Sequence, residues 1–126
     1  TLICMKTLDT QEVYISAKAF RKEVVQIANT FPKEEKFLLV AQIKDSARSI
    51  SANIAEGYGR FHYQEAIQFC RIARGSLLET YDHLSNALDE NYITEIIFSD
   101  LKLKQEHLLK MINGYIAYLK RRKQEV

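Results

Sequence analysis

The short stretch Gly57-Tyr58-Gly59 has the spacing closest to a ligand-binding motif in this sequence. Glycine-rich loops bind nucleotide phosphates because their backbone N–H groups can approach the phosphate closely. A dinucleotide fingerprint needs a third glycine, and a P-loop needs a Lys-Ser/Thr pair after its glycines. Neither completion is present, and a helical pattern precedes the two glycines. We therefore predict that Gly57 ends a helix as a left-handed C′ residue, and that Gly59 lets the chain reverse.

Other residue types that perform chemistry are present but scattered. His62, His83 and His107 lie far apart, and no Glu-x-x-His pair occurs, although a di-iron bundle needs two. Cys70 falls in an apolar helical stripe, where a free cysteine is usually a small apolar residue. The sequence therefore predicts no catalytic residue, no metal site, no cofactor and no small-molecule substrate. An enzyme is the least favoured of the functions considered.

Basic residues form two candidate contact clusters, one around Arg71 and Arg74 and the other from Lys120 to Lys123. Arg71 and Arg74 share a helical face, and an antiparallel neighbour would bring Lys44 or Arg48 close to them. Arg60 follows the glycine pair. The alternatives are a solvated face, pairing with carboxylates such as Glu56 or Glu79, or contact with phosphates. The complete set of candidate contact residues is Lys44, Arg48, Arg60, Arg71, Arg74, Lys120, Arg121, Arg122 and Lys123.

The composition indicates the elements that must position these residues. The chain has 126 residues, one proline, four glycines and a net charge of +2, a balance too mild to indicate a nucleic-acid-binding protein by itself. No apolar run approaches the roughly 20 residues of a membrane span. Cys4 and Cys70 lack metal-site spacing, which favours a reducing, cytoplasmic compartment over a disulfide scaffold. With so few helix-breaking residues, we expect long helices.

Helical periodicity occurs in four segments, and no segment alternates with the period of a strand. We expect helices at about 11–29, 32–56, 63–90 and 94–123. Pro32 is expected in the first turn of the second helix, followed by Glu34 and Glu35. Thr94 is a candidate N-cap for the fourth. Short connections make neighbouring helices antiparallel, so residues 1–126 should form one all-α domain, an antiparallel up-down-up-down four-helix bundle.

Small and polar residues follow one side of the second predicted helix. Ser49, Asn53 and Glu56 stand at i, i+4 and i+7, beside an apolar seam that includes Ile50 and Ile54. They could form a solvated face or a buried polar network that fixes the register of neighbouring helices. The sequence leaves both alternatives open.

The segment FPKEEKFLLVAQIKDSARSISANIAEGYGR, followed by FCRIARGSLLET, resembles a bacterial four-helix-bundle family. That family includes proteins encoded by intervening sequences in 23S ribosomal RNA genes. The sequence is more distantly similar to the accessory variability determinant of diversity-generating retroelements. Family members often have Pro where Ser51 stands and Ser near His62. The residues that match the family motif are Ser49, Asn53, Glu56, Gly57, Arg60, Gly75, Ser76 and Glu79.

This resemblance implies a four-helix bundle that assembles into a ring-like homopentamer, with no established enzymatic activity. It implies contact with RNA or a ribosome. We expect a homo-oligomeric interaction protein, and the alternative is a protein–protein scaffold without nucleic-acid contact. A second argument for assembly is that several aromatic residues lie off the predicted seams and could form an exposed patch. These are Phe61, Tyr63, Phe69, Tyr92, Phe98 and Tyr118.

Overall fold

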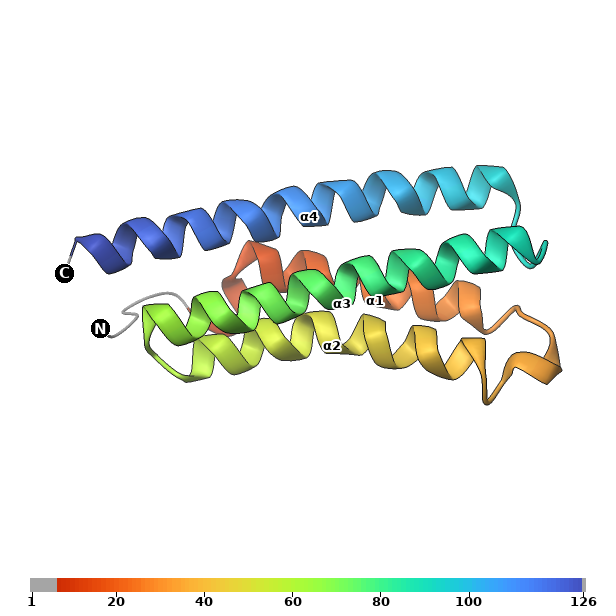
Figure 1. The fold of residues 1–126 in the computed structure, drawn as a ribbon, viewed down its shortest axis with the longest axis horizontal. Helices are drawn as coiled ribbons and strands as arrows, with labels where there is room; N and C mark the ends of the chain where they lie inside the picture. The colour runs from red at the N-terminus through yellow and green to blue at the C-terminus, as the bar shows by residue number, and fades with distance from the viewer. Residues whose placement is uncertain (1–6, 126) are drawn as a thin grey trace.

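The computed structural model describes residues 7–125, and Figure 1 shows its four long helices lying side by side with neighbours antiparallel. This confirms the predicted all-α, up-down-up-down bundle. Cys4 lies outside the described residues. The elements are the 3₁₀ helix η1 (Leu8–Thr10), α1 (Glu12–Ala28), the 3₁₀ helix η2 (Lys33–Glu35), α2 (Leu39–Gly59), α3 (Tyr63–Asp89) and α4 (Glu95–Gln124).

The predicted seams form the core. Val13 and Phe20 of α1, Ile43 of α2, Leu77 of α3 and Ile112 of α4 are all buried. Apolar residues at helical spacing place one face of each helix toward the bundle axis, and burial of those faces stabilises the fold.

The expectation of a large exposed aromatic patch is mostly wrong. Tyr63 is only 2% exposed, and Tyr92, Phe98 and Tyr118 are half-buried side chains packed against the core. Among the six residues proposed for the patch, Phe61 is the exposed one, at 46%. The other five aromatic side chains are buried or half-buried by the neighbouring helices.

The second helix begins later than predicted. Pro32 has extended backbone angles (φ −55°, ψ 148°), and the charged residues after it form η2 and not the first turn of α2. Leu38, with φ −117° and ψ −106°, then interrupts helical geometry, so α2 begins at Leu39. The segment between α1 and α2 is therefore a compact corner.

The prediction for Gly57 is also wrong. The helix continues through both glycines, and no described glycine has a positive φ. The left-handed residue at this corner is Phe61, with φ 57°. Gly57 is instead required for close packing, because an added Cβ would lie 2.9 Å from Phe69 Cβ and 3.1 Å from Ala66 Cα. Gly57 thus allows α3 to approach the backbone of α2.

The fourth helix is much longer than the first. Thr94 caps it as predicted, since its Oγ1 accepts a hydrogen bond from Ile97 N at 3.2 Å. With 30 residues against 17 in α1, the C-terminal part of α4 extends past α1, beside the corner between α2 and α3 (Figure 1).

Candidate nucleic-acid interface

A hollow with basic walls lies between the first half of α3 and the last turns of α4. Arg71, Lys120 and Lys123 line it, and Lys123 Nζ donates a hydrogen bond to Gln64 Oε1 at 2.5 Å. Ile67 and Gln124 complete the lining. The structure therefore brings one arginine of the first predicted cluster together with two lysines of the second.

The charge along the α3–α4 hairpin is unevenly distributed, and the hollow lies at its basic end. Residues 60–75 and 110–125 together contain eight Lys or Arg and two acidic residues, whereas residues 76–100 contain six acidic residues and no Lys or Arg. Because the hairpin is antiparallel, both basic segments lie at the same end of the bundle and the acidic segment extends toward the other (Figure 1). Although the net charge of the chain is small, the α3–α4 hairpin has one strongly basic end and an acidic segment toward the other.

The other predicted contact residues have different surroundings. Arg74 donates a hydrogen bond to Asn113 Oδ1 on α4 at 2.8 Å. Arg122 bonds the Tyr63 side chain, which raises the arginine's pKa, and pairs with Glu125 at 3.0 Å. Both arginines therefore link α3 to α4.

Arg60 lies at the α2–α3 corner. Its Nε is 3.1 Å from Glu56 Oε2, and its guanidinium lies 5.1 Å from the centre of the Phe69 ring. Glu79 pairs with His83 at 3.3 Å. Within the chain, the two carboxylates suggested for Arg71 and Arg74 are therefore engaged elsewhere.

The lining of the basic hollow does not include the remaining predicted residues. Lys44 and Arg48 lie on α2, half-buried and exposed respectively. Arg121 is exposed on α4. Sequence spacing alone could not separate these from the residues that converge, because convergence depends on where α4 crosses α3.

The polar stripe on α2 is a network between helices. Ser76 Oγ donates to Ser49 Oγ at 2.9 Å, and Asn53 Nδ2 donates to the same hydroxyl at 2.8 Å. One turn further along, Thr80 Oγ1 donates to Ser46 Oγ at 2.8 Å. Of the two alternatives for the stripe, the structure supports the network for Ser49 and Asn53, while the exposed Glu56 lies outside it.

Sequence reasoning missed two members of this network. The stripe predicted from the sequence includes neither Ser46 nor Thr80, although both are buried. The available signal was their spacing. Thr80 stands four residues after Ser76 on α3, and Ser46 stands three residues before Ser49 on α2. Residues three or four apart share one helix face. Two such polar pairs on adjacent antiparallel helices can therefore face each other at the same two heights along the bundle.

The described residues offer few reactive groups. Burial raises the pKa of the Cys70 thiol to about 12, so its thiolate is scarce at neutral pH. Within residues 7–125, no group of three or more His, Cys, Asp or Glu side chains could hold a metal ion. None of the helices in this range combines the length and hydropathy that crossing a bilayer requires.

Comparison with known proteins places the chain. A family model described as 23S rRNA-intervening sequence protein matches residues 9–114. The chain belongs to this family. This family member resembles a crystallised protein of unknown function from the S23 ribosomal protein family of Bacteroides thetaiotaomicron, with 25% identity and a TM-score of 0.76 over 82% of this chain and 97% of that one. A comparison with curated proteins gives no match.

The extent of the family match divides the candidate interface. The polar network, Gly57 and Arg71 all lie within residues 9–114, whereas Lys120 and Lys123 lie beyond them. The family's description names no reaction. The match therefore accounts for the bundle and its internal contacts, while half of the basic hollow comes from the part of α4 that the family model does not cover.

Proposed function

We propose that this 23S rRNA-intervening sequence family member is a non-enzymatic, homo-oligomeric interaction protein that binds RNA, alone or within a ribonucleoprotein, through the basic hollow. The observation that carries the proposal is the convergence of Arg71, Lys120 and Lys123 at the basic end of the hairpin. Phosphate is the ligand that suits this set, because arginine can bind two phosphate oxygens and lysine provides a compact charge.

Neighbouring side chains support a polyanion as the ligand. Gln64 and Gln124 supply amide groups that can bond sugars or phosphates, and the hollow's lining contains no acidic residue. Six acidic residues of the hairpin lie in residues 76–100, where they would repel a nucleic acid from the opposite end. The charge distribution would thus orient an approaching RNA as well as attract it.

Homo-oligomerisation would strengthen the binding. In a homopentamer, which we propose as the assembly, each basic hollow occurs five times and a single RNA could contact several of them. Exposed apolar side chains support an assembly of some kind, since Phe37 and Ile96 are 82% and 84% exposed. Isolated exposed apolar residues are ordinary, but contiguous apolar patches with polar rims mark interaction sites, and Phe37 adjoins the exposed Leu38.

The test is the salt dependence of binding to a structured RNA. Three phosphate contacts in each protomer predict a slope of log affinity against log salt of about −2 to −3. The variant Arg71→Gln/Lys120→Gln/Lys123→Gln should bind more weakly and lose most of that slope. Fluorescence anisotropy at several salt concentrations measures both quantities.

The matched control removes the same charge elsewhere. Lys22→Gln/Lys33→Gln/Lys102→Gln alters three exposed lysines on α1, η2 and α4, outside the hollow. It should retain most of the affinity and slope. Equal losses in the two variants would show that net charge, and not the hollow, drives binding. Absence of RNA binding by an intact oligomer would favour the protein–protein scaffold.

A further inference from the structure

The corner between α1 and α2 carries two adjacent apolar side chains in solvent. Phe37 is 82% exposed and Leu38 is 59% exposed. The Lys36 ammonium lies 5.3 Å from the centre of the Phe37 ring, so a positive charge accompanies the pair. The backbone holds them outward, because η2 ends just before them and α2 begins only at Leu39. We name Phe37 and Leu38 the apolar knob.

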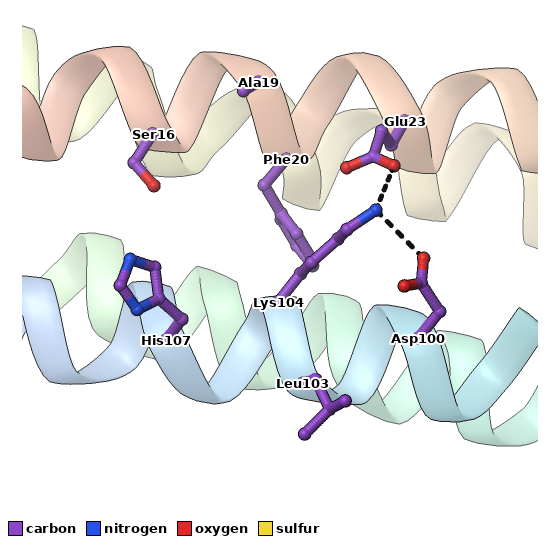
Figure 2. A pocket seen from close by; sticks show the side chains of 8 residues that line it. All are labelled: Ser16, Ala19, Phe20, Glu23, Asp100, Leu103, Lys104 and His107. Carbon is purple, nitrogen blue, oxygen red and sulfur yellow. Dashed lines mark hydrogen bonds and ion pairs between the residues drawn. The ribbon is translucent and has the colours of Figure 1, made fainter.

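The face between α1 and α4 is hollowed on both sides of an ionic bridge. Lys104 Nζ lies 2.5 Å from Glu23 Oε1 on α1 and 2.9 Å from Asp100 Oδ2 on α4, and Figure 2 shows it reaching across between the helices. On one side of the bridge, the lining includes Phe20 and Leu103.

On the other side lies a second hollow of about 370 Å³. Its lining comprises Glu23, Gln26, Ile27, Ile96, Ile97, Asp100 and Leu101. Ile96, at 84% exposed, is the most exposed large apolar side chain of the described residues. We name this the isoleucine hollow.

We propose that the apolar knob of one copy inserts into the isoleucine hollow of the next copy, and that this head-to-tail contact closes the ring. This inference rests on the homo-oligomerisation in the proposed function and specifies its interface. A contact between two different patches is heterologous, and heterologous contacts generate rings when the rotation closes. A homopentamer requires a contact of this kind.

Position along the bundle supports this pairing. The knob follows the end of α1, and the hollow is formed by the last turns of α1 and the first turns of α4. Both patches therefore lie toward the same end of the molecule (Figure 1). Rotation about an axis parallel to the bundle keeps each patch at its own height, so patches at one end can meet in a closed ring.

Size and charge are also complementary. A cavity of about 150 Å³ already accepts benzene, so the isoleucine hollow can accept a phenyl ring with part of a leucine. Two carboxylates, Glu23 and Asp100, share the single ammonium of Lys104, which leaves the rim negative. Lys36 would arrive at this rim together with the Phe37 ring. Glu35, which could oppose it, is hydrogen-bonded to Tyr92 within its own chain.

A mixing experiment tests the pairing. The knob variant is Phe37→Ser/Leu38→Ser, and the hollow variant is Ile96→Lys, which also repels Lys36. Each alone should sediment as a monomer near 14.7 kDa, while the wild-type chain forms a larger closed species. Mixed in equal amounts, the two variants should form a heterodimer, because the mixture contains one intact knob and one intact hollow for each pair of chains.

The control is Leu103→Ser, an exposed apolar residue on the other side of the bridge, which should still assemble like the wild type. Thermal unfolding checks that each variant folds, as expected for changes at solvent-exposed positions. A wild-type oligomer that persists in both variants, or variants that fail to pair on mixing, would overturn the inference alone. A monomeric wild type would overturn both the ring and this interface.

A covalent measurement keeps the test independent of these disruptive variants. In a Cys4→Ser background, Lys36→Cys/Gln26→Cys leaves the knob and Ile96 intact and should give a ladder of disulfide-linked chains on a non-reducing gel after mild oxidation. Lys36→Cys/Leu103→Cys should give much less of it. Equal ladders in both, or none in either from an assembled protein, would contradict the proposed contact.

Discussion

The α2–α3 contact and the α1–α4 contact are built in opposite ways. Between α2 and α3, Gly57 brings the backbones together and buried hydroxyls bond across the helices. Between α1 and α4, a half-exposed lysine bridges two carboxylates, and hollows lie on both sides of it. One contact is tightly packed and hydrogen-bonded, while the other is open to solvent.

This difference indicates that the two helix contacts contribute differently to folding and to association. A buried hydrogen-bonded pair fixes helix register, because any other alignment leaves polar groups buried without partners. A face with exposed isoleucine and leucine contributes less to the fold of the single chain and has apolar area available for association. Substitutions at the first contact should therefore affect folding, and substitutions in the isoleucine hollow of the second should affect assembly.

The largest expected effect is that of Gly57→Ala. The added Cβ would meet Phe69 Cβ at 2.9 Å and the Ala66 backbone at 3.1 Å, so a helix must shift. Overpacking typically costs about 1–3 kcal/mol, and the upper end applies here because the atoms met are Phe69 Cβ and the Ala66 backbone. Alanine's better helix propensity offsets only about 1 kcal/mol of this cost. We expect a net loss of about 2 kcal/mol in the free energy of unfolding, measured by urea denaturation.

Gly75→Ala is the matched control for this comparison. An added Cβ at Gly75 meets nothing within 4 Å, and the residue lies inside α3. The change should stabilise the monomeric fold by about 0.5–1 kcal/mol. If the two substitutions changed the free energy of unfolding equally, Gly57→Ala would act through helix propensity alone, and the α2–α3 approach would not be tight.

The next largest effect is expected at the buried hydroxyl pair. Thr80→Val keeps the side chain's shape but removes the donor to Ser46 Oγ and to the Ser76 carbonyl, both at 2.8 Å. We expect a loss of about 1 kcal/mol. Adding Ser46→Ala should cost less than the sum of the single changes, as a double-mutant cycle would show. Strict additivity would mean that the two hydroxyls do not act as a pair.

The sequence predicted the helices and the core because both depend on local periodicity. Ile43, Leu77 and Ile112 recur at helical spacing and are buried. It failed at Pro32, where Leu38 interrupts the helix despite a favourable start signal. It failed at Gly57 for a different reason. The close approach of Ala66 and Phe69 is a tertiary constraint that resembles a helix-ending signal in the sequence.

The candidate interface was predictable only in part. The runs around Arg71 and Lys120 are visible as clusters, but their convergence depends on the crossing of α3 and α4. Phe61 was expected at an exposed position and occupies one, although its left-handed φ of 57° carried no sequence signal. Glycine and asparagine are the usual residues there, and a phenylalanine gives no local indication of such a backbone.

The smallest expected effect on folding is at the ionic bridge between α1 and α4. The hydrogen bonds that the Lys104 ammonium donates to Glu23 and then to Asp100 raise the pKa of Lys104 above its usual value. Because the folded-state pKa is the higher one, the bridge stabilises fully below the unfolded pKa of about 10.4 and is lost as the pH rises through the folded value. Lys104→Met should lower the melting temperature at pH 7 less than either change at the α2–α3 contact, since exposed ion pairs contribute little. It should also reduce the decline in melting temperature above pH 10. A loss as large as that of Gly57→Ala would show that the open face also holds the bundle together.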